Sequence, residues 1–102
     1  MKSLDELLID KYVIVRCESA GVFAGTLKKK EGGAVELENA RRLWYWNGAA
    51  TLSQLACEGV KFPDDCKFPQ EVSQIILIGV IEIIAATDMA KKSIAKVPVW
   101  KV

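Results

Sequence analysis

Residues 39–51 read Asn-Ala-Arg-Arg-Leu-Trp-Tyr-Trp-Asn-Gly-Ala-Ala-Thr, a run that predicts a central β-strand. Two arginines and three aromatic residues fall within the six positions 41–46. In an extended chain, alternate side chains point to opposite faces of the sheet. One face would then carry Arg42, Trp44 and Trp46, and the opposite face would carry Arg41, Leu43 and Tyr45.

The chemistry of this strand supports two interpretations. A cation beside flat rings suits a ligand that combines a base with a phosphate, and we expect such a site on the face with Arg42, Trp44 and Trp46. Alternatively, the run is a half-buried strand whose arginine stems cover apolar surface while their charged ends reach water. Asn47-Gly48 ends the strand, because this pair favours a turn.

The strands expected before this run make an antiparallel meander with it. β-Branched and aromatic residues predict strands at 12–16 and 22–29. Gly21 and Gly25 indicate a bulge or a close approach of another group to the backbone. Glu31-Gly32-Gly33 then predicts a hairpin tip.

After this tip, a short strand at 34–38 is expected to turn at Asn39 into the strand 40–46. The run 71–86 predicts two more strand segments with a bend or bulge at Gly79. Its continuous apolar residues predict burial on both faces. Glu82 interrupts them, so it either faces solvent on an edge strand or pairs with Arg41 or Arg42.

Three short helices are predicted from N-capping residues. The spacing of a capping box occurs at Ser3 with Glu6 and at Thr51 with Gln54. The helices are expected before Asp10, between Thr51 and Gly59, and from Asp88 to about Ala95 behind the N-cap Thr87.

These elements predict one α+β domain over residues 1–102. We expect a small antiparallel β-sheet or partly open barrel with two or three short helices. A chain of 102 residues buries roughly two-thirds of its unfolded surface, and its apolar content of 51% exceeds the usual ~45–50%. The surplus apolar surface predicts a homo-oligomer, a dimer or larger.

Composition argues against several classes of function. The 14 basic and 13 acidic residues give a net charge of +1, which is unlike a protein that binds duplex DNA. The chain has no histidine, and its cysteines, Cys17, Cys57 and Cys66, are far apart, so neither a metal site nor a disulfide framework is indicated. Because the usual catalytic groups and cofactor motifs are missing, we expect a binding protein without a cofactor and not an enzyme.

The sequence also predicts a protein of the cytoplasm. The N-terminal residues lack the basic and then apolar pattern of a signal peptide. The longest apolar run, Ile75 to Ile81, is far shorter than the roughly 20 residues of a membrane span. We therefore expect no membrane as a partner.

Basic residues suggest where an anion would bind. Arg16, Arg41 and Arg42 are the only arginines, and guanidinium groups hold phosphates through two hydrogen bonds. The amides at the start of the helix behind Thr87 are a further candidate phosphate site.

The motifs and their order resemble the Thoeris anti-defence protein one family of phages and prophages. The resemblance spans nearly the whole chain. It is carried by Tyr12-Val-Ile-Val-Arg16, Ser19-Ala-Gly-Val-Phe-Ala-Gly25, Asn39-Ala-Arg-Arg-Leu-Trp-Tyr-Trp46, Gly48-Ala-Ala50, Cys66-Lys-Phe-Pro69 and Val80-Ile-Glu-Ile-Ile84.

This resemblance implies a protein that sequesters a cyclic nucleotide immune signal without cleaving it. The signal would be glycocyclic ADP-ribose, made by bacterial TIR-domain proteins, and cyclic oligonucleotides of CBASS systems are a further possibility at separate sites. Within this frame, arginines would neutralise the diphosphate, aromatic rings would stack on adenine, and polar side chains would bind ribose hydroxyls. The ligand-binding residues expected are Arg16, Phe23, Asn39, Arg41, Arg42, Trp44, Trp46, Asn47, Thr87 and Asp88.

A second hypothesis is a small barrel-like adaptor. It would bind single-stranded nucleic acid, or a protein partner, through the same aromatic strand. A polynucleotide contact weakens steeply as salt rises, whereas an enclosed pocket for a small ligand weakens less.

Overall fold

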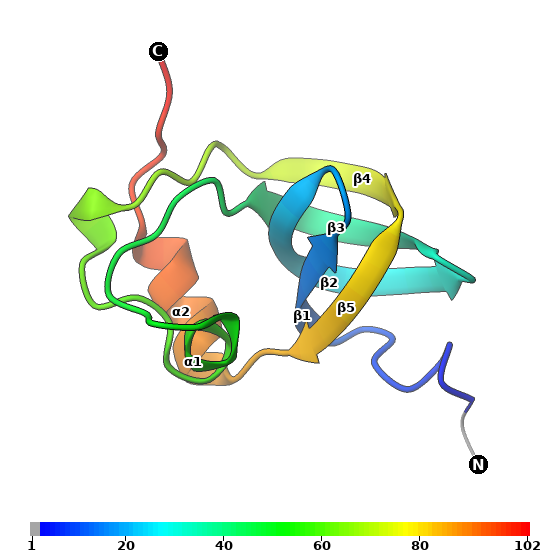
Figure 1. Ribbon diagram of the computed structural model, residues 1–102. Helices are drawn as coiled ribbons and strands as arrows, with labels where there is room; N and C mark the ends of the chain where they lie inside the picture. The colour runs from blue at the N-terminus through cyan, green and yellow to red at the C-terminus, as the bar shows by residue number, and fades with distance from the viewer. Residues whose placement is uncertain (1–2) are drawn as a thin grey trace.

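The structure, a computed structural model that describes residues 3–102, is an α+β fold (Figure 1). A five-stranded antiparallel sheet has the order β4-β3-β2-β1-β5, and two α-helices lie to one side of it. The predicted fold class is confirmed. The elements are β1 (Tyr12–Cys17), β2 (Gly21–Glu31), β3 (Ala34–Arg42), α1 (Leu52–Glu58), a 3-10 turn (Pro63–Asp65), β4 (Val72–Ile78), β5 (Val80–Ala85) and α2 (Asp88–Lys96).

β4 and β5 follow each other in the chain but lie at opposite edges of the sheet. Gly79, with φ +79°, turns the chain between them, which confirms the predicted bend. The Glu18 amide donates to the Gly79 carbonyl at 2.9 Å, and the Val80 amide donates to the Gly33 carbonyl at 3.0 Å. The sheet therefore curls until its edges meet at this corner, but in the described residues β4 and β5 do not pair, so the barrel stays open.

β3 is one strand and not the two expected on either side of Asn39. Glu38 pairs with Thr26 and Arg41 with Ala24, so two residues of β3 lie opposite the single residue Gly25. Asn39 takes the left-handed conformation, with φ +52°, that such a bulge requires. The prediction of a bulge or close approach at Gly25 is also confirmed, since a Cβ there would lie 3.0 Å from the Ala40 Cα.

β3 ends at Arg42, so the alternation of faces expected up to Trp46 does not continue. Beyond it, Tyr45 and Lys67 form an isolated antiparallel bridge. The aromatic run is therefore a loop that pairs with the segment after the 3-10 turn. Its rings do not share a sheet face with Arg42.

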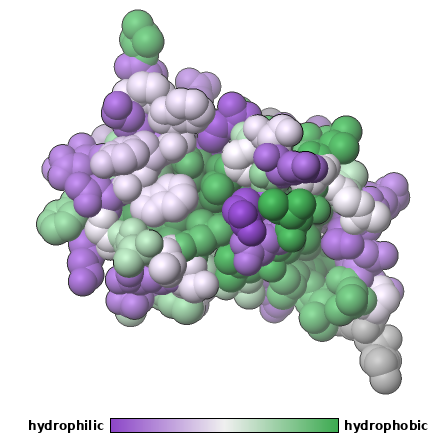
Figure 2. All heavy atoms as spheres, in the orientation of Figure 1, coloured by the Kyte–Doolittle hydropathy of each residue, from purple (hydrophilic) through white to green (hydrophobic). Residues whose placement is uncertain are grey.

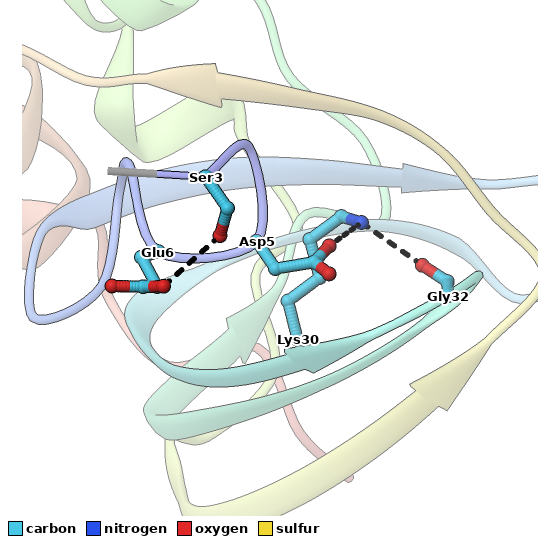
Figure 3. A network of polar contacts seen from close by, with 5 residues as sticks. All are labelled: Ser3, Asp5, Glu6, Lys30 and Gly32. Carbon is cyan, nitrogen blue, oxygen red and sulfur yellow. Dashed lines mark hydrogen bonds and ion pairs between the residues drawn. The ribbon is translucent and has the colours of Figure 1, made fainter. Parts of the chain in front are cut away.

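The N-terminal segment, residues 3–11, forms successive turns and not the expected helix. Ser3 donates to the Glu6 carboxylate at 3.1 Å, while Lys30 of β2 binds Asp5 at 2.8 Å and the Gly32 carbonyl at 3.0 Å (Figure 3). Leu8 and Ile9 pack against the buried residues inside the curled sheet. These contacts with β2 stabilise the turns more than a helix of fewer than two turns would be stabilised, because so short a helix has only marginal stability by itself.

Two groups of buried residues lie on the two faces of the sheet. The barrel core, on the concave face, contains Val13, Val15, Cys17, Phe23, Leu27, Val35, Leu37, Ala40 and Leu77. The helix core, beneath α1 and α2, contains Ile14, Ala24, Leu43, Leu55, Ala56, Val60, Cys66, Phe68, Ile94 and Val97. β1 is buried on both faces, because alternate residues enter each core.

The run 71–86 is not buried on both faces, contrary to the prediction. β4 and β5 are the edge strands, and five of the seven residues of β4 are exposed. Ile76 and Ile78 are 67% and 78% exposed. Hydrophobic surface also extends from the region of β5 and β1 toward the N-terminal segment (Figure 2).

Both helices after β3 begin and end as their capping residues predict. The Thr51 hydroxyl accepts from the Gln54 amide at the start of α1, and Gly59, with φ +79°, ends that helix. The Thr87 hydroxyl accepts from the Ala90 amide at the start of α2. The two helices bury Leu55, Ala56, Ala90 and Ile94 against the sheet and each other.

Candidate functional site

A polar pocket of about 370 Å³ lies where β1, β2 and β3 meet the last turns of α2. Tyr12 and Thr26 are paired across β1 and β2, so their side chains lie on the same face of the sheet. Asn39 of the β3 bulge and Glu71, just before β4, complete the polar wall. The other lining residues are Arg41, Lys91, Ile94, Ala95, Val97 and Val99.

Polar side chains in this pocket are free to bind a ligand. Among the hydrogen bonds and ion pairs of residues 3–102, none involves the side chain of Tyr12, Thr26, Asn39 or Glu71. A hydroxyl, a phenol, an amide and a carboxylate therefore line one hollow without a side-chain hydrogen bond or ion pair to another residue of 3–102. This set can both donate to and accept from a ligand rich in hydroxyl groups.

Arg41 forms the back of the pocket and is bound to the protein itself. Its guanidinium donates to the carbonyls of Pro69 and Ile94 at 2.8 Å and to those of Phe68 and Pro98 at 3.1 Å. Only 6% of the residue is exposed. Arg41 was expected to neutralise a diphosphate. Its donors instead bind backbone carbonyls and hold the end of α2 against the loop before β4.

Burial, more than the nearby charges, keeps the Tyr12 phenol protonated. Burial raises the pKa of Tyr12 to about 12, the Glu71 carboxylate adds to the rise, and Arg41 opposes it. Burial also lowers the pKa of the Arg41 guanidinium, although Tyr12 and Glu71 oppose that shift. The Lys91 ammonium lies 5.4 Å from the centroid of the Tyr12 ring. Tyr12 thus offers a neutral hydroxyl, and Lys91 offers a positive charge beside it.

Arg42 and Phe23 lie on the opposite, concave face. The Phe23 ring is buried in the barrel core, and the Arg42 guanidinium covers it at 4.7 Å from the ring centroid. Both line a hollow of about 220 Å³ beside the edge strand β4. The ring that was expected to stack on adenine is therefore covered.

Arg16 lies apart from both hollows. Its Nε donates to the Glu82 carboxylate at 3.0 Å, across the paired strands β1 and β5. Glu82, on the edge strand β5, therefore pairs with an arginine, and the arginine is Arg16 instead of Arg41 or Arg42. Arg16 is half-exposed, so its other donors still face solvent.

The aromatic loop contributes little to the pocket. Trp44 is 64% exposed, whereas Trp46 packs against the helix core. The Asn47 amide donates to the Cys66 sulfur at 3.4 Å. Burial raises the pKa of the Cys66 thiol, and its contact with Asn47 opposes the rise. Asn47 is therefore part of the loop's own packing.

Thr87 and Asp88, at the start of α2, do not line the pocket. The Thr87 hydroxyl donates to the Cys57 carbonyl at 2.6 Å and accepts from the Ala90 amide at 3.1 Å. These bonds give Thr87 a structural role. By contrast, Lys91, one turn further along α2, does line the pocket.

Of the residues predicted for the site, the pocket brings together only Asn39 and Arg41. The sequence did not single out Tyr12, Thr26, Glu71 or Lys91, which come from a strand pair, a loop and a helix. No local motif connects them, because the bulge at Asn39 and the packing of α2 bring them together. The only local signal was the pair of polar residues Tyr12 and Thr26 in otherwise apolar strands.

The described residues contain neither a cluster of metal ligands nor a membrane-spanning helix. No group of three or more histidine, cysteine, aspartate or glutamate side chains within 3–102 is placed to hold a metal ion. No helix in this part of the chain is long and apolar enough to cross a membrane.

The fold and the pocket define a small α+β domain with a polar hollow on the helix-covered face of an open barrel. The chain belongs to the family described as "Domain of unknown function (DUF6948)", whose model matches residues 10–94. No curated protein and no solved structure matches the chain. The matched range includes every polar residue of the pocket.

Proposed function

We propose that the protein binds a small anionic ligand rich in hydroxyl groups, such as a nucleotide, in the pocket between the sheet and α2. The observation that carries this proposal is the group of uncommitted polar side chains, Tyr12, Thr26, Asn39 and Glu71, facing one hollow. The pocket volume of about 370 Å³ lies within the ~300–1,000 Å³ usual for small-molecule sites.

Each lining group has a role in this proposal. Lys91 contacts a phosphate, because its ammonium is an exposed positive charge at the rim. The Glu71 carboxylate accepts from ribose hydroxyls, and the Tyr12 phenol donates to the ligand. Arg41 contributes its positive charge from behind but makes no direct contact, since its donors hold the backbone.

We further propose that the ligand is a cyclic nucleotide immune signal of the glycocyclic ADP-ribose type. The protein would sequester this signal and so keep it from a bacterial defence system. The resemblance to the Thoeris anti-defence protein one family supports this narrower proposal, and the pocket chemistry agrees with a ribose-containing diphosphate. The protein would act in the cytoplasm of an infected bacterial cell, as a homo-oligomer. Cyclic oligonucleotides are a second ligand class to test.

Isothermal titration calorimetry tests the proposal directly. Glycocyclic ADP-ribose, ADP-ribose and a cyclic dinucleotide are titrated into the wild-type protein and into Lys91→Ala and Glu71→Gln. We expect one of these nucleotides to bind, with affinity at least tenfold weaker in each variant, or about 1.4 kcal/mol. Lys29→Ala, which removes an exposed lysine from the hairpin tip, is the matched control and keeps full affinity.

Two results would contradict the proposal. Absence of binding for all three nucleotides excludes a nucleotide as the ligand. Binding that Lys91→Ala and Glu71→Gln leave unchanged places the ligand elsewhere.

The ligand is expected to leave the protein unchanged. After incubation, the protein is denatured with heat and the released nucleotide is identified by mass spectrometry. Recovery of the intact nucleotide supports sequestration, whereas a hydrolysed product would show that the protein is an enzyme.

A further inference from the structure

We propose that Tyr45, Lys67 and Trp100 form a second binding surface, the aromatic platform, whose partner is single-stranded nucleic acid. These three residues are far apart in the sequence, and none of them lines the polar pocket. The platform goes beyond the proposed nucleotide pocket and does not depend on it.

Backbone hydrogen bonds hold the three residues side by side. The Tyr45 amide donates to the Lys67 carbonyl at 3.3 Å, and the Lys67 amide donates to the Tyr45 carbonyl at 2.7 Å. The Trp100 amide donates to the Phe68 carbonyl at 3.0 Å. Because Tyr45 and Lys67 are directly opposed in an antiparallel bridge, their side chains leave the backbone on the same side.

The side chains place a cation between two exposed rings. The Lys67 ammonium lies 6.0 Å from the centroid of the Tyr45 ring and 5.6 Å from that of the Trp100 ring. Tyr45 is 49% exposed and Trp100 is 46% exposed. A contiguous group of exposed rings marks a candidate interaction surface, and an ammonium beside them favours a partner with negative charge.

A nucleic acid strand matches this order of groups. Successive bases are joined by one phosphate, so a base can stack on each ring while the phosphate between them meets Lys67. Duplex DNA does not fit, because its bases are stacked on each other and present no free face.

The charge of the platform favours a strand over an apolar peptide. A peptide that covered both rings would also cover the Lys67 ammonium and leave it without a partner, which is costly. A phosphate diester supplies that partner. Stacking is tolerant of base identity, so the platform is expected to bind strands of many sequences.

Fluorescence titration tests the platform, because Trp100 is part of it. A short oligothymidylate is added to the wild-type protein at low salt, and tryptophan emission is expected to fall as bases stack. Trp100→Ala and Tyr45→Ala should each weaken binding by about 5- to 150-fold, as loss of one stacked base does elsewhere, with affinity measured by anisotropy of a labelled strand. Lys67→Ala should reduce the slope of log affinity against log salt by about 0.7, the loss of one phosphate contact.

Matched controls separate the platform from general effects. Met89→Ala removes an exposed apolar side chain from α2, and Lys29→Ala removes an exposed lysine from the hairpin tip; both should bind like the wild type. Trp100→Phe keeps a ring and should retain affinity within a few-fold, which shows that a loss in Trp100→Ala is not a failure to fold.

Three results would overturn the proposal. The first is absence of binding by the wild-type protein at low salt. The second is equal affinity for a duplex or for thymidine monophosphate. The third is binding that no substitution in the platform weakens.

Discussion

Arg41 joins four backbone carbonyls that belong to three separate segments, so its loss is expected to destabilise the whole fold. Each buried acceptor left without a donor costs roughly 1–3 kcal/mol. We predict that Arg41→Ala lowers the free energy of unfolding by about 3 kcal/mol or more, measured by urea denaturation. Arg41→Lys should also destabilise, because an ammonium cannot replace the planar fork.

Arg42→Ala is the matched control for this prediction. The Arg42 guanidinium is exposed and, within residues 3–102, has no hydrogen bond or ion pair. Its contact with the Phe23 ring is worth about 0.5–1 kcal/mol at exposed sites. If the two alanine variants were equally stable, the fastening role of Arg41 would be wrong.

Because of Tyr12, the free energy of unfolding is expected to fall at alkaline pH. Its pKa is raised from 10.0 to about 12 in the folded protein, so the folded state holds the phenolic proton more tightly than the unfolded chain. The resulting stabilisation is fully present below pH 10 and is lost as the pH rises toward 12. Tyr12→Phe should remove this contribution, and unfolding curves recorded from pH 9 to about 12 test it. If the free energy of unfolding of Tyr12→Phe fell with pH as steeply as that of the wild type, the prediction would be contradicted.

At the scale of single residues, the sequence could not distinguish Arg41 from Arg42. The two neighbours have the same chemistry, yet only Arg41 is buried, and Arg42 lies on the other face. Which arginine is buried depends on carbonyls supplied by residues 68, 69, 94 and 98. No pattern within the strand contains that information.

At the scale of elements, the bulge in β3 connects backbone conformation with the pocket. Asn39 has φ +52°, a conformation that asparagine and glycine adopt readily and β-branched residues do not. We predict that Asn39→Val lowers the free energy of unfolding by about 1–3 kcal/mol, whereas Asn39→Gly is nearly neutral. Thermal unfolding of both variants measures this difference.

The same two variants separate folding from binding. Asn39→Gly keeps the bulge but removes the amide from the pocket, so it should weaken nucleotide binding while leaving stability intact. Equal stability of the glycine and valine variants would show that the left-handed conformation is not required.

Local signals predicted the elements well wherever the determinant was itself local. Capping residues gave α1 and α2, and the two glycines at 32–33 gave the hairpin. The helix predicted in the N-terminal segment is wrong, because its capping-box spacing competes with contacts to β2, which is distant in sequence. The extent of β3 was also beyond local signals, since the aromatic residues after Arg42 pair with Lys67 instead of continuing the sheet.

At the scale of the whole molecule, β4 offers an uncharged edge for a second copy of the chain. From Val72 to Val80 the sequence contains no charged residue, although natural edge strands usually carry charges that prevent association. We predict a homo-oligomer in solution, and light scattering coupled to size-exclusion chromatography measures its mass. Ile76→Lys and Ile78→Lys should shift it to the monomer.

Met89→Lys provides the control for the oligomer. Met89 is exposed to a similar degree but lies on α2, so this variant should keep the mass of the wild type. A wild-type protein that is monomeric at all concentrations tested would show that the β4 edge is not an interface.

The α+β class and the antiparallel sheet were predictable from the sequence, because strand patterns and glycine turns are regular features of the chain. The position of β5 beside β1 was not, since nothing in 80–85 specifies whether that segment pairs with its neighbour in sequence or with a strand at the start of the chain. The pocket depends on this same global arrangement. For that reason most of the residues that the sequence predicted for an anionic-ligand site lie outside the pocket.

The return of β5 to β1 also sets the order in which the chain can fold. During synthesis, β1 to β4 can assemble as a meander, but one edge of β1 has no partner until residues 80–85 leave the ribosome. Pairing over such a separation raises the contact order, which slows folding. The newly made chain therefore passes through a stage in which its most buried strand is open on one side, and during that stage a chaperone or a second nascent chain can bind where β5 belongs.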